Sequence, residues 1–156
     1  KHHECIPCFL KTWEQRWYLI AEPLNRKNPS VYALERISNL RLTEQQLSPS
    51  PYINPQSYFE GCYGVNHEDC PPVPIKIKVY GSQVDYVRAR PIHSSQEEVE
   101  QGYGWSVFSY WLRPSYNFYQ MLLWHREKVE VMEPEEVREE MKKIVNQISK
   151  QYNIYG

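Results

Sequence analysis

The chain has 156 residues, of which 41% are hydrophobic and 14% aromatic, and its formal net charge is −1. This length accommodates one sizeable domain or two small ones, and the apolar content is sufficient to offset the entropy of ordering the chain, which excludes intrinsic disorder. The near-neutral charge also excludes a polyanion-binding field over the whole surface, so any nucleic-acid contact must come from a local patch.

Membrane, secreted and metal-binding classes are disfavoured by simple patterns. No run approaches the roughly 18 consecutive apolar residues that span a bilayer, and no basic-then-apolar leader opens the sequence, so we expect a cytoplasmic protein. Cys5 and Cys8 have a Cys-x-x-Cys spacing, but Cys62 and Cys70 are too far apart to form the second tight pair of a zinc module. We therefore expect free thiols in a reducing compartment, and no metal site.

Short β-strands dominate the first part of the chain. Residues 16–22 are rich in β-forming side chains, residues 23–29 carry turn residues, and residues 30–34 form a second strand. Apolar residues alternate with arginines over residues 37–42, which continues the strand pattern. Several short strands ending at a proline-rich stretch predict a small Sm-like or SH3-like β-barrel, which we place at residues 1–70.

The second part, after a stiff spacer of prolines, alternates strands with helices. The expected elements are, in chain order, a strand at 75–80, a helix at 82–90, an extended stretch at 92–96, a central strand at 105–112, a helix at 116–126, a strand at 128–132 and a helix from 134. This order predicts a ferredoxin-like β-α-β-β-α-β fold with an added C-terminal helix, at residues 71–156.

The final helix is the most clearly specified element. Glu135 and Glu136 stand at its start and Lys142, Lys143 and Lys150 near its end, as the helix dipole favours. Its apolar residues fall on one stripe, which comprises Val137, Met141, Ile144, Val145, Ile148 and Tyr152. This apolar face must dock on another surface.

The first part also resembles a known family. The segments Ile6-Pro7, Leu10-Lys11, Arg16-Trp-Tyr-Leu19 and Tyr32-Ala-Leu-Glu-Arg-Ile37 resemble the WYL domain, named for its Trp-Tyr-Leu tripeptide. In the second part, Pro91-Ile-His-Ser-Ser-Gln96 and Val129-Glu-Val-Met-Glu-Pro134 are similar to the C-terminal extension that often follows this domain. Nearly the whole chain therefore resembles the WYL region of bacterial transcriptional regulators.

The resemblance implies a function. It implies an Sm-like barrel that binds a nucleotide or a single-stranded nucleic acid, and an extension that helps to form a homodimer. It also implies that a winged helix-turn-helix domain, absent from these residues, contacts double-stranded DNA, so we expect the chain to be a fragment. Two departures bear on the ligand: Ala33 stands where relatives often have a second arginine, and Glu35 replaces a commoner aspartate.

The candidate ligand-binding residues are Lys11, Arg16, Tyr18, Arg36, Arg41, His93 and Gln96. The guanidinium of Arg36 can make two parallel hydrogen bonds to a phosphate, although an ion pair with Glu35 or Glu44 would be a structural alternative; the resemblance favours the ligand. Because Trp17 and Tyr18 point to opposite faces of a strand, we expect Trp17 in the core and Tyr18 facing the ligand.

Two segments of the second part, residues 93–96 and the central strand at 105–112, are each open to two interpretations. His93 and Gln96 either bind phosphate or base edges, or fix a turn or a contact between domains. On the central strand, either Phe108 and Tyr110 or Trp105 and Trp111 face away from the helices. There, burial against the barrel or a dimer partner is favoured over base stacking.

Catalytic patterns are missing. The sequence has no paired carboxylates, nucleophile constellation or glycine-rich phosphate loop, so we expect neither an enzyme nor a cofactor. The leading hypothesis is the effector-sensing and dimerisation region of a transcriptional regulator. The alternative is a purely structural dimerisation module with a vestigial ligand site.

Overall fold

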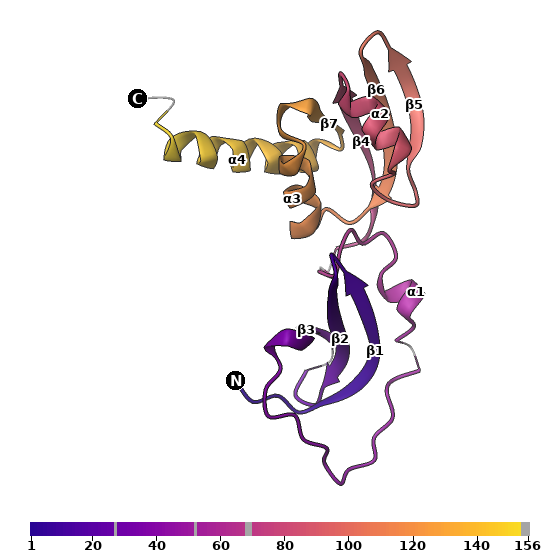
Figure 1. The fold of residues 1–156 in the computed structure, drawn as a ribbon, viewed down its shortest axis with the longest axis vertical. Helices are drawn as coiled ribbons and strands as arrows, with labels where there is room; N and C mark the ends of the chain where they lie inside the picture. Colours follow the sequence, from indigo (N-terminus) through magenta and orange to yellow (C-terminus); the bar gives the residue numbers. More distant parts are fainter. Residues whose placement is uncertain (27, 52, 68–69, 154–156) are drawn as a thin grey trace. The chain divides into compact units, whose positions relative to one another are not determined.

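The computed structural model describes residues 1–26, 28–51, 53–67 and 70–153, which form two compact units (Figure 1). Unit 1 comprises Lys1–Glu60 and Gly64–His67, and unit 2 comprises the remainder of the described chain. The predicted domain boundary between residues 70 and 71 stays a prediction. Each unit is described by itself.

Unit 1 contains a three-stranded antiparallel sheet with the order β1-β2-β3. Its elements are β1 (Cys5–Trp13), β2 (Arg16–Pro23), β3 (Ser30–Ala33), the 3-10 turn η1 (Leu34–Arg36) and helix α1 (Pro55–Tyr58). Glu14 and Gln15 join β1 to β2 with φ of 46° and 63°, the left-handed conformation of a two-residue hairpin loop. Ile20 and Ala21 are fully buried at the centre of the sheet.

The sheet of unit 1 is open, which corrects the expectation of a barrel. In the described part of the chain, β1 and β3 each pair with β2 and not with one another. The expected strand over residues 37–42 is not formed, because the backbone turns through η1 and Asn39 takes a φ of 54°. Leu40 and Leu42 are 80% and 98% exposed, so this segment has no apolar face packed against the sheet. The fold is a mixed α+β fold with two antiparallel sheets and no closed barrel among the described residues.

Unit 2 contains a four-stranded antiparallel sheet with the order β5-β6-β4-β7. Its elements are β4 (Val73–Tyr80), α2 (Gln83–Ala89), β5 (Glu97–Gly102), β6 (Trp105–Leu112), α3 (Tyr116–Trp124), the 3-10 turn η2 (Arg126–Lys128), β7 (Val129–Glu133) and α4 (Glu135–Gln151). Strand β6 lies inside the sheet, as predicted. Residues 92–96 are a turn in which Gln96 N donates to His93 O at 3.0 Å, so the strand begins later than expected. Within the described residues, no helix combines the length and apolar character needed to cross a membrane.

The core of unit 2 follows from the alternation in β4. Ile75, Ile77 and Val79 are fully buried, whereas the intervening lysines stay partly exposed. The buried side of the sheet packs against residues of α2 and α3. Phe108 and Tyr110 belong to this core, while Trp111 is 46% exposed on the other face. The tryptophans of β6 are therefore the residues that face away from the helices.

A buried histidine makes the stability of unit 2 depend on pH. His125 follows α3 and is 6% exposed, and Gln83 Nε2 donates to its Nδ1 at 2.9 Å. Burial lowers the pKa of His125 below its ordinary value of 6.5. The unfolded chain therefore takes up a proton at a pH where the folded chain does not, and this lowers stability as the pH falls from about 6.5 through the lower folded pKa.

We expect this loss to disappear in the His125→Gln variant. The measurement is urea denaturation at a series of pH values from about 7.5 to 5, comparing slopes of unfolding free energy against pH. His2→Gln, at an exposed position, serves as the control and should keep the wild-type slope. An unchanged slope in His125→Gln would assign the pH dependence to other groups.

Candidate ligand-binding site

A cross-strand row on the sheet of unit 1 holds two of the candidate residues. Lys11 on β1 lies opposite Tyr18 on β2, and Tyr18 lies opposite Ala33 on β3. Opposed residues of antiparallel strands share a face, so these three side chains form one row. Lys11 Nζ is 3.8 Å from the centroid of the Phe59 ring, which fixes the ammonium by a cation–π contact. The row thus offers a cation and a half-buried phenol on one face.

The arginines next to this row differ in their partners. Arg16 Nη1 lies 3.7 Å from Glu35 Oε1, and both side chains are largely exposed. This ion pair links the start of β2 to η1, whose last residue is Arg36. The alternative that Arg36 pairs with Glu35 or Glu44 has no support, because in the described part of the chain Arg36 has no ion-pair partner. Its exposed guanidinium is open to an anion.

An aromatic cluster of Phe9, Tyr58, Phe59 and His67 accompanies Lys11, and sequence reasoning did not predict it. The Phe9 ring contacts Tyr58 and Phe59 edge-on, with centroids 6.1 and 6.0 Å apart. Tyr58 stacks on His67 at 4.4 Å with an interplanar angle of 19°. These contacts join residues far apart in the chain, so local patterning carries no signal for them.

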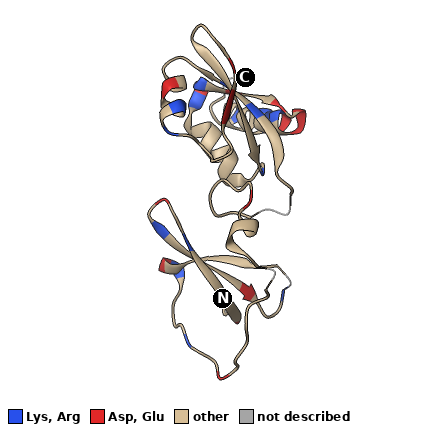
Figure 2. Cartoon of the chain, turned by 90° about the vertical axis from the view of Figure 1, so that its right-hand side faces the viewer, with Lys and Arg blue, Asp and Glu red and all other residues tan. Residues whose placement is uncertain are grey.

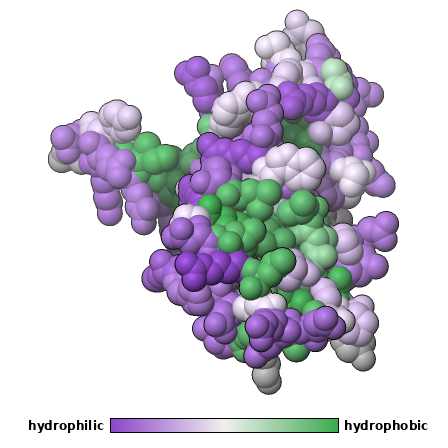
Figure 3. All heavy atoms as spheres, turned by 60° about the horizontal axis from the view of Figure 1, so that its bottom comes forward, coloured by the Kyte–Doolittle hydropathy of each residue, from purple (hydrophilic) through white to green (hydrophobic). Residues whose placement is uncertain are grey.

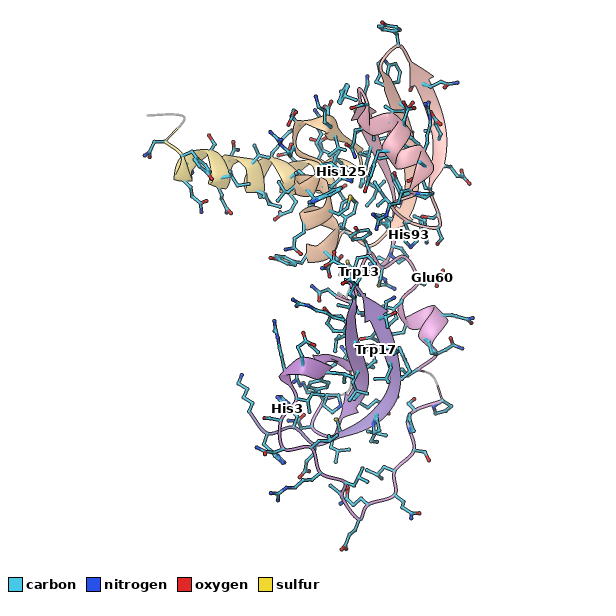
Figure 4. The ribbon with its side chains drawn as sticks, viewed as in Figure 1. His3, Trp13, Trp17, Glu60, His93 and His125 are labelled. Carbon is cyan, nitrogen blue, oxygen red and sulfur yellow. The ribbon has the colours of Figure 1, made fainter. Side chains whose placement is uncertain are left out.

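The side chain of Trp17, in the Trp-Tyr-Leu tripeptide of β2, does not point into the core as predicted. Trp17 is 53% exposed, so the expectation that it lies in the core is wrong. The physical reason is that the face shared by Trp17 and Leu10 is uncovered at this end of the hairpin, although the same face is covered farther along β2, where Ala21 is fully buried. Leu10, also 53% exposed, shares the uncovered face with Trp17. Figure 4 labels Trp17 on this hairpin.

His93, labelled in Figure 4, and Gln96 both lie in unit 2. Both make hydrogen bonds within this unit. Gln96 Oε1 accepts from Tyr110 Oη at 2.9 Å and from Ile92 N at 3.0 Å, and its Nε2 donates to Val87 O at 3.0 Å. Burial raises the pKa of Tyr110, which keeps its hydroxyl a donor.

The neighbouring turn is fixed in the same way. Ser95 N donates to His93 Nδ1 at 3.2 Å, and Trp111 N donates to Ser95 Oγ at 2.9 Å. These bonds fit the interpretation that His93 and Gln96 fix a turn against β6. A ligand role for either residue stays a prediction.

Arg41 lies outside the strands that carry the cross-strand row. It lies in a stretch without helix or strand, is exposed, and has no ion-pair partner among the described residues. Figure 2 shows the basic positions of unit 1 interspersed with acidic ones rather than gathered in one field. Any anion site in unit 1 therefore depends on a few individual cations.

The cysteines and other metal-ligand residues do not form a metal centre in the described ranges. Cys5, Cys8, Cys62 and Cys70 are not joined in disulfide bonds. Burial raises the pKa of the Cys8 thiol, which disfavours the reactive thiolate. Nowhere in the described part do three or more His, Cys, Asp or Glu side chains meet in a metal-binding arrangement.

Comparisons with known proteins match both parts of the chain. A family model described as the WYL domain matches residues 3–42, and one described as the WCX domain matches residues 71–149, about half of the chain. A solved structure, the proteasome accessory factor B/C (PafBC) of Arthrobacter aurescens, is similar with 18% identity and a TM-score of 0.38. The match covers 89% of this chain and 21% of that one, so this chain spans about a fifth of its length. The search of curated proteins gave no match.

Proposed function

The chain belongs to the family of proteins that carry WYL and WCX domains, and from this we propose that it is the effector-sensing region of a transcriptional regulator. The effector is a nucleotide or a single-stranded nucleic acid that binds unit 1. Double-stranded DNA is contacted by another domain of the regulator and not by these residues. In this role the chain catalyses no reaction and binds no cofactor.

The observation that carries this proposal is the exposed guanidinium of Arg36, the last residue of the turn η1 that directly follows β3, whose Ala33 lies opposite Tyr18 in the row. A guanidinium and an ammonium supply the hydrogen bonds that a phosphate accepts. Tyr18 and the ring of Phe59 supply aromatic surface, and base stacking on such rings contributes about 1–3 kcal/mol per base in single-strand binding. Together these groups suit one or two nucleotides better than a long duplex.

The finer fold assignment is part of the proposal. We infer that unit 2 is ferredoxin-like, which its element order β4-α2-β5-β6-α3-β7 and its sheet order β5-β6-β4-β7 support. We also infer that the sheet of unit 1 is part of an Sm-like arrangement, of which three strands are described. The boundary between the two domains is placed at residues 70 and 71.

Regulation requires that the effector bind two arrangements of the regulator with different affinity, since equal binding shifts no equilibrium. We propose that occupation of the row in unit 1 changes the geometry of a dimer and so the affinity of the DNA-binding domain. The coupling then depends on which surface forms the dimer.

Arg36→Ala tests the site directly. We expect short single-stranded DNA or a nucleotide to bind at least about tenfold more weakly to this variant, since one charge-assisted phosphate contact is lost. Fluorescence or calorimetric titration at low and moderate salt measures the affinity. The logarithm of affinity should fall with the logarithm of salt concentration, by about 0.7 per phosphate contacted on a single strand.

The matched control is Arg26→Ala, an exposed arginine in the β2–β3 turn of the same unit. Wild-type affinity in this variant and loss in Arg36→Ala would locate the site. Equal losses in both variants would show only general attraction to cations and would contradict the proposal.

A second function, a structural dimerisation module with a vestigial ligand site, is favoured by one observation. Ala33 contributes only a methyl group to the cross-strand row, at a position where the resemblance implies an arginine. The same titration separates the two functions. A folded, dimeric chain that binds no nucleotide or oligonucleotide would support the structural module.

A further inference from the structure

A groove lies between α4 and the rest of unit 2. Its volume is about 430 Å³. Leu122 of α3 and Val131 of β7, both in the buried core cluster, line one side, and Met141 and Val145 of α4 line the other. Small-molecule sites in proteins commonly have volumes of about 300–1,000 Å³ and mostly apolar walls. The groove therefore has the size and lining of a site for a small ligand.

The wall formed by α4 has an apolar row and a polar row. Residues four apart lie next to one another on a helix surface, so Met141 and Val145 form one row. Arg138, Lys142 and Asn146 form the adjacent row, and all three line the groove. In Figure 3 the helix projects to the left, and apolar and hydrophilic atoms lie side by side where it leaves the rest of the unit. A ligand in the groove thus meets apolar side chains along one edge and hydrogen-bond donors along the other.

The first residue of the polar row is neutralised within the chain. Arg138 Nη1 donates to Val131 O at 3.1 Å, and its Nη2 lies 3.0 Å from Glu130 Oε1. Glu130 also accepts from Tyr80 Oη at 2.7 Å. Arg138 and Glu130 therefore balance one another, and neither charge needs a ligand.

Lys142 is the cation of the groove that a ligand can engage. Its Nζ pairs with Glu139 and lies 3.6 Å from Glu135 Oε1, but the lysine side chain is 50% exposed and the two acids are 49% and 67% exposed. Ion pairs between exposed side chains contribute little to stability, because water competes for both partners. The ammonium therefore exchanges a carboxylate of its own helix for a ligand anion at small cost, and its three donors allow it to keep the other.

Two further polar groups on this face of α4 lack a partner among the described residues. The exposed side-chain amide of Asn146 makes no hydrogen bond there. Ser149 is 9% exposed, and its Oγ is buried without a hydrogen bond. Because it follows Asn146 by three residues and Val145 by four, it lies next to both on the helix surface. A buried hydroxyl without a partner is rare in proteins, since it loses water and gains nothing in return, so this face calls for a polar group from outside these residues.

We propose that the groove binds a small amphipathic monoanion, whose apolar body lies between α4 and β7 and whose carboxylate accepts hydrogen bonds from Lys142 and Asn146. The apolar walls exclude a wholly polar ligand. Glu130 in the lining disfavours a doubly charged phosphate, whereas one carboxylate matches the one exchangeable ammonium. This is a second ligand site, in unit 2, and it does not rest on the effector site proposed for unit 1.

The test titrates the whole chain with decanoate and with decylammonium, which has the same apolar tail and the opposite charge. Calorimetry measures both affinities, with each probe kept below its micelle concentration. Decanoate is expected to bind with a Kd of about 0.1–1 mM, as suits a ligand of this size. Decylammonium should bind at least about tenfold more weakly, because its charge meets Lys142.

Lys142→Glu should reverse this preference. We expect decanoate to bind at least about tenfold more weakly to the variant and decylammonium to become the tighter probe, since the charge at the polar row changes sign. Lys143→Glu is the matched control, because it makes the same substitution at a residue that pairs with Glu140 and does not line the groove. It should change the decanoate Kd by less than about twofold, since exposed charges away from the site are screened by salt.

Val145→Trp tests the apolar part of the site. The indole fills the groove, so decanoate affinity should fall at least about tenfold. Val99→Trp on β5 is the control, because both valines are 49% exposed, and it should keep the wild-type affinity. Since Val145 is half exposed, circular dichroism should show that the variant is folded.

Several results would overturn the proposal. They are the absence of decanoate binding up to about 5 mM, equal binding of the two probes, equal losses in Lys142→Glu and Lys143→Glu, and wild-type affinity in Val145→Trp. A chain that binds no decanoate and sediments as a dimer would assign the groove to a second copy, which also overturns it. Arg36→Ala should bind decanoate as the wild type does, so this site and the effector site of unit 1 fail separately.

Discussion

Phe118→Ala is expected to lower the free energy of unfolding of unit 2 by about 4 kcal/mol. Phe118 is fully buried on α3 and packs in the core cluster with the inward side chains of β4 and β6. Removing the ring loses its transfer free energy and leaves a cavity that the sheet cannot close. Because domains are stable by only about 5–15 kcal/mol, the variant should be close to unfolding at physiological temperature.

Urea denaturation followed by circular dichroism measures this loss, and hydrogen exchange assigns it to unit 2. Tyr116→Ala is the control on the same helix, where the side chain is 62% exposed, and it should change stability by no more than about 0.5 kcal/mol. A similar small change in Phe118→Ala would mean that the core does not depend on the α3 contact.

Gln96→Leu is expected to destabilise unit 2 by about 3 kcal/mol, and this result would decide between the two roles of Gln96. The substitution leaves Tyr110 Oη, Ile92 N and Val87 O without the partner that each has now. Each unpaired buried group costs about 1–3 kcal/mol, and the backbone groups of the turn regain water in part. Adding Tyr110→Phe removes one of the unpaired groups, so the double variant should lose less than the sum.

Thermal and urea denaturation of Gln96→Leu, Tyr110→Phe and the double variant measure the coupling free energy between the two substitutions. Gln120→Leu is the control, since Gln120 lies exposed on α3 and its hydrogen bonds, to Tyr116 Oη and from Asn117 Nδ2, lie at the surface. If Gln96→Leu leaves stability unchanged and weakens ligand binding instead, the structural role is wrong and the ligand role gains support.

Local patterning was enough to predict most of unit 2. The alternation of Ile75, Ile77 and Val79 with lysines identifies β4 before any contact is known, and the acidic start and basic end of α4 identify a helix. These patterns depend only on residues close together in the chain, so they can be recognised in a single sequence. The WYL resemblance gave the family, which the matches over residues 3–42 and 71–149 support.

Features that depend on distant contacts could not be predicted. The exposure of Trp17 depends on which face of the sheet other residues pack against. The contact between Lys11 and Phe59 joins β1 to a residue beyond the long loop that follows η1. The strand expected over residues 37–42 had the right alternation but no packed face to hold it. For Gln96, the turn that uses its amide is set by Val87 on α2 and Tyr110 on β6, which the sequence does not place together.

The two-residue loop at Glu14 and Gln15 bears on how the chain folds. It brings β1 and β2 together through contacts between close sequence neighbours, and such hairpins form in about 1–10 µs. The central pair of unit 2 joins β4 to β6 across α2 and β5, so a much longer loop must close before the pair gains any contact. Pairing of β4 with β6 is therefore slower than formation of the β1–β2 hairpin, which is formed while that search continues.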